Sequence, residues 1–488
     1  MCAMILAIDQ GTSGTTALAV DAAAQVAGRG YATVHQQYPR PGWVEHDAAQ
    51  IWDSVCTASR AALAQAGGPS LAAIGVANQR ETAVAWNART GQPLAPAIGW
   101  QCRRTADACA SLRAAGLEAE VIRRTGLVLD PYFSATKFAW LLGEVSAVAA
   151  AQAAGELRLG TVDSWLIWNL TGGRHVTDAS NASRTLLCDI DQGAWSSALA
   201  GLFDVPLATL PSIVDSSGVA GLTRPADPFP GRVPIAGIAG DQQAALFGHT
   251  GTGPGTTKIT YGTGCFLLRD GGTVRPPAVE GLLTTVAWRR AGALTYAHEG
   301  SVFTGGALIQ WLRDELGVIA TAAESEILAR RVPDAAGAVI VPAFAGLGAP
   351  YWDPGARGAI LGLTRGVGRA HICRAALEAI AHQVADVLEL MPGVPPAVRV
   401  DGGAATNALL LEIQASVLGR PVVRPSQLET TALGAAYLAG LGVGFWSSVE
   451  QIAALRGPDT VFPPGRAERV TARDVWRRAV ARAQDWAP

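Results

Sequence analysis

Lysine is nearly absent from this chain of 488 residues, which contains only Lys137 and Lys258. Neither lysine follows a glycine, so the G-x-x-x-x-G-K-[ST] pattern of a P-loop is missing. The lysine arrangement of the protein kinases is missing as well. Any nucleotide site in this chain must therefore be built without a lysine-tipped phosphate loop.

Charge of either sign is scarce. Charged residues make up 16% of the chain, and the formal net charge is −2. Acidic and basic residues interleave, which leaves no extended basic face for a polynucleotide and no polybasic tail for a membrane surface. We therefore expect no nucleic acid among the partners.

Paired cysteines and long apolar runs are also missing. The seven cysteines are scattered singly, without a CxxC pair, so we expect reduced thiols and no zinc site. Apolar stretches such as 339–349 are broken well before the roughly 18 residues of a membrane span. Residues 1–8 lack the charged start of a signal peptide and lead directly into Asp9. These features predict a cytoplasmic protein with no membrane span.

What the chain has instead is an alternation of short β-patterned runs and longer alanine-rich helical runs, which predicts an α/β fold. Its length favours two domains with a cleft between them over a single core. The expected strands are 5–8, 17–20, 26–33, 71–77, 258–261, 265–268 and 398–400, and the expected helices are 48–65, 305–315, 372–390 and 409–418.

Two turns rich in Gly, Thr and Ser, within 7–16 and 259–265, each join two expected strands. Such turns direct backbone N–H groups and hydroxyls into one concavity that suits phosphate oxygens. Taken alone, each turn is more typical of an ordinary hairpin than of a phosphate site. Together they favour a nucleotide site made by two related halves. The Gly-Thr-Gly-Pro-Gly segment within 249–256 predicts the join, and hence domains at 1–249 and 250–488.

A third glycine site, residues 400–407, lies between an expected strand and an expected helix. Gly402 and Gly403 allow the backbone to approach a flat ligand closely, and the Asn407 amide can bond its polar edge. The same pattern is typical of a helix entry with Asn407 as the N-cap. Both interpretations are open at this point.

Eleven stretches, in order along nearly the whole chain, match one known family. They are residues 9–12, 41–47, 78–82, 100–105, 130–134, 160–168, 181–185, 237–248, 260–266, 348–353 and 358–378. On these residues the chain resembles the glycerol kinases, in the FGGY carbohydrate-kinase branch of the actin-like ATPases. The resemblance implies two RNase H-like (actin-like ATPase) domains with a central interdomain cleft. The polyol would bind the N-terminal domain and the nucleotide the C-terminal domain, in a homodimer or homotetramer.

The implied reaction is phosphorylation of glycerol by ATP. Glycerol has three hydroxyls and a thin apolar edge, so its site needs polar groups and an aromatic wall. The resemblance implies Asp241 as general base and a glycerol site made of Arg80, Glu81, Trp100, Tyr132, Asp241, Gln242 and Phe266. Taken without the resemblance, Arg80 and Glu81 are typical of a solvated surface pair. Asp241 is likewise typical of a helix cap.

The resemblance also implies MgATP as the second ligand. The residues implied to contact the phosphates are Thr12, Ser13, Gly14 and Thr263. Those implied to contact the nucleoside are Gly306, Gln310, Gly403 and Asn407. Magnesium is a hard ion that prefers carboxylate and water ligands, and Asp9 is expected to hold it through water.

The chain departs from the glycerol kinases at three places. Thr16 stands where they commonly carry an arginine, so one positive phosphate contact is missing. Prolines replace glycines in 223–232, the loop that binds fructose 1,6-bisphosphate in enterobacterial relatives, so we expect that inhibition to be weak or missing. The region after Pro463 does not match the segment that docks the phosphotransferase-system regulator.

Two other functions are compatible with parts of this pattern. One is a related kinase for xylulose or erythritol, since its nucleotide turns and base would look alike. The other is an actin-like regulator that binds nucleotide without phosphorylating a substrate. The set of polyol-binding residues favours glycerol over both.

Overall fold

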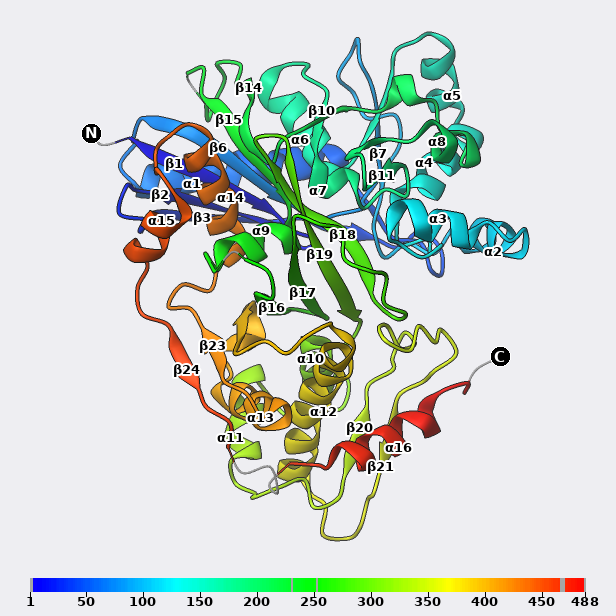
Figure 1. Cartoon of the computed structure of the whole chain (residues 1–488), viewed down its shortest axis with the longest axis vertical. Helices are drawn as coiled ribbons and strands as arrows, with labels where there is room; N and C mark the ends of the chain where they lie inside the picture. The colour runs from blue at the N-terminus through cyan, green and yellow to red at the C-terminus, as the bar shows by residue number, and fades with distance from the viewer. Residues whose placement is uncertain (1–2, 230, 252, 466–469, 487–488) are drawn as a thin grey trace.

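The computed structural model describes residues 3–229, 231–251, 253–465 and 470–486. Its centre is one sheet of 13 strands that runs from the upper to the lower part of the molecule (Figure 1). The strand order is β24 (Thr460–Phe462), β23 (Val422–Arg424), β22 (Val398–Asp401), β16 (Thr257–Tyr261), β17 (Cys265–Gly272), β19 (Ala293–Val302), β18 (Leu283–Arg290), β14 (Ser217–Leu222), β15 (Pro234–Gly240), β6 (Leu71–Asn78), β1 (Met4–Gln10), β2 (Gly14–Val20) and β3 (Val26–Thr33).

Helices cover both faces of this sheet and extend beyond it. They are α1 (Ala48–Gln65), α2 (Ala106–Ala114), α3 (Glu118–Thr125), α4 (Ser134–Glu144), α5 (Ser146–Ala153), α6 (Val162–Thr171), α7 (Ala179–Ala182), α8 (Ser197–Leu202), α9 (Asp241–Gly248), α10 (Gly306–Asp314), α11 (Ala322–Ala329), α12 (Arg369–Leu390), α13 (Ala408–Leu418), α14 (Thr430–Gly442), α15 (Val449–Leu455) and α16 (Arg473–Ala483). Small sheets pair β4 (Gln36–Gln37), β5 (Glu45–His46) and β8 (Ala97–Ile98); β7 (Val84–Asn87) and β9 (Leu157–Gly160); β10 (Val176–Asp178) and β13 (Ser212–Val214); β11 (Cys188–Asp189) and β12 (Ala194–Trp195); and β20 (Val339–Val341) and β21 (Ala359–Leu361).

The two halves of the chain repeat one pattern. In the first, β1 and β2 form an antiparallel hairpin, and β6 returns parallel to β1 after α1. In the second, β16 and β17 form the hairpin, and β22 returns parallel to β16 after α12. This confirms the α/β expectation. It also places both Gly/Thr/Ser turns at the ends of hairpins, as the sequence predicted.

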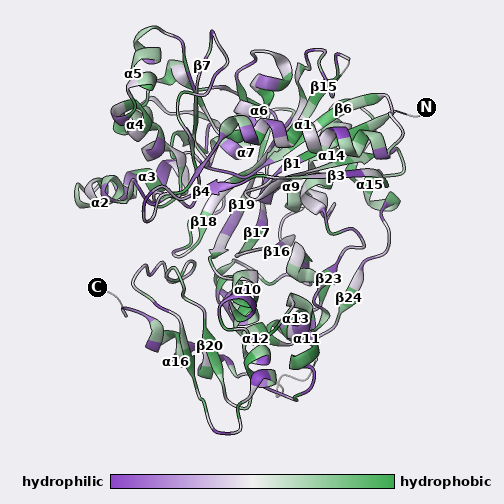
Figure 2. Ribbon diagram, turned by 180° about the vertical axis from the view of Figure 1, so that it is seen from behind, coloured by the Kyte–Doolittle hydropathy of each residue, from purple (hydrophilic) through white to green (hydrophobic). Residues whose placement is uncertain are grey.

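The sheet of the first half is the middle layer of three. Along β1, Ile5 and Ala7 pack with α9 and α14 on one face, whereas Leu6 and Ile8 pack with α1 and α6 on the other. A strand buried on both faces is apolar at almost every position. Figure 2 accordingly shows β6 and β15 coloured as hydrophobic.

Helix α14 comes late in the sequence but lies against β6, β15 and β1 of the first half (Figure 1). Its many Gly and Ala residues allow this close packing. A Cβ added at Gly434 would lie 1.8 Å from the Ala244 carbonyl oxygen of α9, and one added at Gly75 of β6 would lie 2.1 Å from the Ala435 carbonyl oxygen. Only glycine fits at such crossings.

The join expected within 249–256 lies between α9 and β16, and Thr252 in it is outside the described residues. Because one sheet runs through both halves and α14 returns to the first, the division at 249/250 stays a prediction. In the part of the chain that the structure describes, no helix combines the length and apolar character needed to cross a membrane.

Candidate active site

Arg80 and Glu81 lie one residue beyond the end of β6 and are buried, with 3% and 1% of their surface exposed. The solvated surface pair that these residues would suggest in isolation is therefore excluded. Glu81 has a φ of 62°, in the left-handed region that non-glycine residues rarely adopt. The Ser134 hydroxyl donates to the Glu81 carbonyl at 3.0 Å and helps to hold this conformation. Strain of this kind costs about 1–3 kcal/mol and is concentrated at functional sites.

Two arginines and two glutamates form a buried charge cluster around this turn. Glu299 on β19 accepts hydrogen bonds from both terminal nitrogens of Arg80, at 2.6 and 2.7 Å. Arg184, after α7, donates to Glu81 at 2.6 Å and to Glu299 at 3.2 Å. Burial alone would raise the pKa of the Glu299 carboxyl, but Arg184 and Arg80 outweigh it and lower that pKa to about 2. Glu299 is therefore ionised at neutral pH, whereas burial raises the pKa of the Glu81 carboxyl above its ordinary value.

Sequence reasoning named Arg80 and Glu81 but missed Arg184 and Glu299. Arg184 lies within 181–185, one of the stretches that carried the family resemblance, so a signal for it was present. Glu299 had no such signal, since it comes from a strand more than 200 positions beyond Arg80. Its bidentate contact takes one N–H from each terminal nitrogen of Arg80, and the expected binding of glycerol by Arg80 stays a prediction.

Asp241 is the first residue of α9, and its side chain is 27% exposed. Its Oδ1 atom lies 3.2 Å from Arg80 Nε and accepts from the Gln242 backbone N–H at 2.7 Å. These contacts hold the carboxylate in place and leave Oδ2 to accept a proton.

Three aromatic rings expected to form the wall of the polyol site lie together. The Trp100 ring centroid is 5.5 Å from that of Tyr132 and 6.2 Å from that of Phe266, in edge-to-face arrangements. The indole N–H of Trp100 donates to the Thr12 hydroxyl at 2.9 Å. The aromatic wall thus contacts the turn between β1 and β2. Phe266 contributes a side chain from β17 of the second half.

Asp9, the second-last residue of β1, lies close to other carboxylates. Its pKa is raised well above the ordinary value, first by burial and then by Asp241, Glu429 and Asp401. Such an excess of negative charge fits a divalent cation. However, the described residues contain no group of three or more side chains able to ligate a metal directly. Magnesium held through water and phosphate oxygens, with Asp9 as an outer partner, fits this arrangement.

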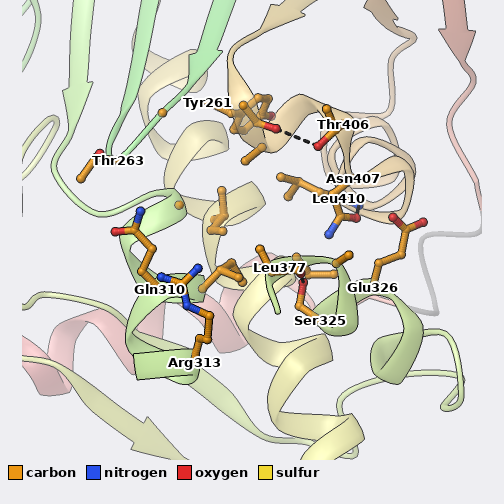
Figure 3. Close-up of a pocket in the computed structure, with 18 residues that line it drawn as sticks. Tyr261, Thr263, Gln310, Arg313, Ser325, Glu326, Leu377, Thr406, Asn407 and Leu410 are labelled. Atoms are coloured by element: carbon orange, nitrogen blue, oxygen red, sulfur yellow. Dashed lines mark hydrogen bonds between the residues drawn. The ribbon is translucent and has the colours of Figure 1, made fainter. Parts of the chain in front are cut away.

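A separate cavity of about 370 Å³ lies in the second half, within the size range of small-molecule sites. Five of the eight residues expected to bind nucleotide line it: Thr263, Gly306, Gln310, Gly403 and Asn407. Figure 3 shows the polar side chains of Gln310 and Asn407 around an apolar floor that includes Leu377. The sequence did not indicate the α11 contribution of Ser325 and Glu326 or the α10 residue Arg313. These three residues belong to no glycine motif.

The glycine turns build the near edge of this cavity. The Gly305 N–H donates to the Thr263 carbonyl at 2.8 Å, and the Gly306 N–H donates to the Gly262 carbonyl at 2.8 Å. Asn407 accepts the Leu410 N–H at 2.9 Å, so the helix-cap interpretation of this residue is confirmed. Since the cap uses its carbonyl oxygen, the amide NH₂ of Asn407 remains to bond a ligand.

The remaining three expected nucleotide residues, Thr12, Ser13 and Gly14, form the β1–β2 turn outside this cavity. A Cβ added at Gly14 would lie 2.7 Å from the Ala32 carbonyl oxygen, so this position requires glycine. Thr16 pairs with Asp9 across the hairpin and is buried. Of the two regulatory segments, Pro230 and residues 466–469 lie outside the described residues, and both expectations stay predictions.

Residues 4–248 match the model of the FGGY family of carbohydrate kinases, N-terminal domain, and residues 257–443 match that of its C-terminal domain. The chain belongs to the FGGY family of carbohydrate kinases. Among its relatives, this carbohydrate kinase is 55% identical to the glycerol kinase of Aromatoleum aromaticum over 491 residues, which covers 99% of both chains.

Solved structures agree with this assignment. The Plasmodium falciparum glycerol kinase with ADP superposes with a TM-score of 0.90 at 31% identity and covers 99% of this carbohydrate kinase and 98% of that chain. The xylulose kinase from Rhodospirillum rubrum gives a TM-score of 0.83 at 25% identity and covers 98% of both chains. The expected two-domain actin-like ATPase fold is confirmed.

Proposed function

We propose that this carbohydrate kinase transfers the γ-phosphoryl group of ATP to a terminal hydroxyl of glycerol, giving sn-glycerol 3-phosphate. The observation that carries the proposal is the buried Arg80–Glu81 turn, ion-paired to Asp241 beside an aromatic wall. The glycerol kinase of Aromatoleum aromaticum, at 55% identity over 99% of its length, supports the same substrate.

Because ATP is the donor, we place the reaction in the cytoplasm. We also propose a homodimer or homotetramer, which analytical ultracentrifugation would test.

In this mechanism Asp241 accepts the proton of the attacking hydroxyl. Phosphoryl transfer proceeds through a loose transition state, so most of the rate comes from alignment and charge neutralisation. Magnesium, when bound near Asp9, neutralises the β- and γ-phosphate oxygens. The aromatic wall of Trp100, Tyr132 and Phe266 covers the carbon edge of the polyol and excludes water from the reacting hydroxyl.

A coupled ADP-release assay with magnesium and ATP tests the substrate. Glycerol, dihydroxyacetone, erythritol, xylulose and xylitol are compared, and we expect glycerol to have by far the highest kcat/KM. A higher value for xylulose or erythritol would favour the related-kinase function. If none of the five compounds supported ADP release, the result would favour the nucleotide-binding regulator.

Asn407 offers a test of the nucleotide site that separates capping from binding. Asn407→Asp keeps the oxygen that caps α13 but removes the NH₂ donor, so we expect the KM for ATP to rise about tenfold, equivalent to about 1.4 kcal/mol. Its thermal stability should stay near that of the wild type. Asn407→Ala removes both groups and should also lose about 1 kcal/mol of stability. An Asn407→Asp enzyme with an unchanged KM for ATP would contradict the binding role.

A further inference from the structure

The only two lysines of the chain are both buried, each with none of its surface exposed. The other basic residues, 36 of the 38, are arginines. Lys137 lies on α4 and Lys258 on β16, 121 positions apart in the sequence. Each nevertheless contacts a residue of the proposed glycerol site, and neither contact is used in the mechanism above.

Lys258 fixes the orientation of the Gln242 side chain. Its Nζ donates to Gln242 Oε1 and to the Thr260 hydroxyl, the latter at 2.7 Å. An ammonium group has only donors, so the atom of Gln242 that faces it must be the carbonyl oxygen. The NH₂ end of the amide is then left to donate. Asp241 can accept a hydrogen bond from a polyol hydroxyl. The neighbouring Gln242 can donate one to a polyol hydroxyl.

Lys137 fixes the backbone on the other side of the site. Its Nζ donates to the Tyr132 carbonyl at 2.6 Å and to the Glu81 carbonyl at 3.3 Å. Glu81 has the left-handed backbone described above, a conformation that persists only where its surroundings hold it. One ammonium group therefore ties the strained turn that presents Glu81 to the segment that presents Tyr132.

Both positions require the geometry of an ammonium group. Lysine carries a compact charge with three donors on a flexible stem, whereas the guanidinium of arginine is a wide planar fork. Burial lowers the pKa of each lysine to about 8, so each is mostly protonated at neutral pH. Around Lys258 the charged groups are Asp401, Asp241, Arg80 and Glu299, and around Lys137 the nearest is Glu81.

We propose that Lys258 and Lys137 are positioning residues for the polyol, holding respectively the Gln242 amide and the Glu81–Tyr132 backbone in the orientation that binds glycerol. The proposal rests on the proposed function, because it concerns the same site. It predicts an effect on glycerol binding that is separate from nucleotide binding.

The test is a set of steady-state kinetics on Lys258→Met, Lys258→Arg, Lys137→Met and Lys137→Arg. We expect the KM for glycerol to rise about tenfold or more in each, equivalent to at least about 1.4 kcal/mol, while the KM for ATP stays within about twofold. The arginine variants should not restore the wild-type KM, because the wider fork does not fit. Parallel rises in both KM values, or an unchanged KM for glycerol, would overturn the proposal.

Trp446→Phe is the matched control for a lost buried hydrogen bond. Trp446 is buried in the core cluster that contains α14, and its indole N–H donates to the Ala22 carbonyl at 3.1 Å. We expect this variant to lose thermal stability with both KM values unchanged. A rise in its KM for glycerol as large as in the lysine variants would mean that any loss of stability produces the effect, which would also overturn the proposal.

A second measurement uses the wild-type protein and does not depend on a variant that folds. With lysine labelled at ¹³Cε, the NMR spectrum contains one signal from each of two lysines. Adding glycerol without ATP should shift both signals, and unchanged signals at saturating glycerol would overturn the proposal. If the wild type phosphorylates another polyol and not glycerol, the proposed function fails. The same variants and titration with that polyol then decide the role of the lysines.

Discussion

Replacing Asp241 by asparagine is expected to lower kcat by about 10²–10⁴-fold, the usual contribution of a general base. Asparagine has nearly the same shape and keeps an oxygen to accept from Arg80 and from the Gln242 N–H, so the site should stay assembled. It cannot accept the proton of the attacking hydroxyl. Single-turnover kinetics with saturating glycerol and MgATP would measure the loss, and we expect the KM for glycerol to change little.

Asp107→Asn is the matched control for this experiment. Asp107 lies in the first turn of α2, as Asp241 lies in the first turn of α9, but it is exposed and outside the site. Loss of a favourable charge near a helix N-terminus costs less than about 1 kcal/mol at such a position. We expect kcat to stay at the wild-type value. If Asp241→Asn retained most of the activity, Asp241 would not be the base.

Glu299→Gln is expected to destabilise the protein by about 3–5 kcal/mol, because it leaves two buried arginines without their shared carboxylate. Glu299 accepts hydrogen bonds from both terminal nitrogens of Arg80 and from one nitrogen of Arg184, and none of its surface is exposed. Urea unfolding at neutral pH would measure the change. The KM for glycerol should rise as well, since Arg80 is then free to move away from Asp241.

The control for this variant is Glu120→Gln, which removes the carboxylate that Arg123 and Arg124 share on α3. Exposed pairs of this kind contribute about 0–1 kcal/mol. A loss for Glu299→Gln no larger than that for Glu120→Gln would show that the cluster does not hold the site together.

The Glu299 cluster also predicts how stability depends on pH. The pKa of Glu299 is about 2 in the folded protein, against an ordinary value of 4.5. A depressed pKa means that the contribution is fully present above about pH 4.5 and is lost as the pH falls toward 2. The difference in urea midpoint between wild type and Glu299→Gln should therefore narrow as the pH is lowered from 7 to 3. A constant difference would contradict the ion-pair account.

The local elements of the fold were predictable from the sequence because local patterns determine them. The expected strand 26–33 and helix 48–65 agree with β3 and α1 at both ends, and Asp47 caps α1 by accepting from the Ala49 and Gln50 N–H groups. Return of α14 to the first half was not predicted. Its Gly and Ala residues are typical of any closely packed helix and do not indicate which elements it packs against.

The residues of the candidate site also fall into two groups, those that the local sequence indicates and those that tertiary packing brings in. The motif residues, such as Asp9, Arg80 and Asp241, stand at the ends of strands or the start of a helix, where the residue types themselves indicate chemistry. The cavity of the second half is also lined by residues of α10 and α11, among them Arg313 and Glu326, which belong to no motif. Packing between elements distant in the sequence decides such a lining.

The sequence by itself determined the α/β class, the paired Gly/Thr/Ser turns, the absence of a P-loop and the carbohydrate-kinase family. Only the tertiary structure decided that Glu299 and Arg184 complete the charge around Arg80 and Glu81. It also decided that both lysines are buried and contact residues of the proposed polyol site. The physical reason is that a buried charge must find its partner in space, and β19 brings Glu299 to Arg80 from more than 200 positions away.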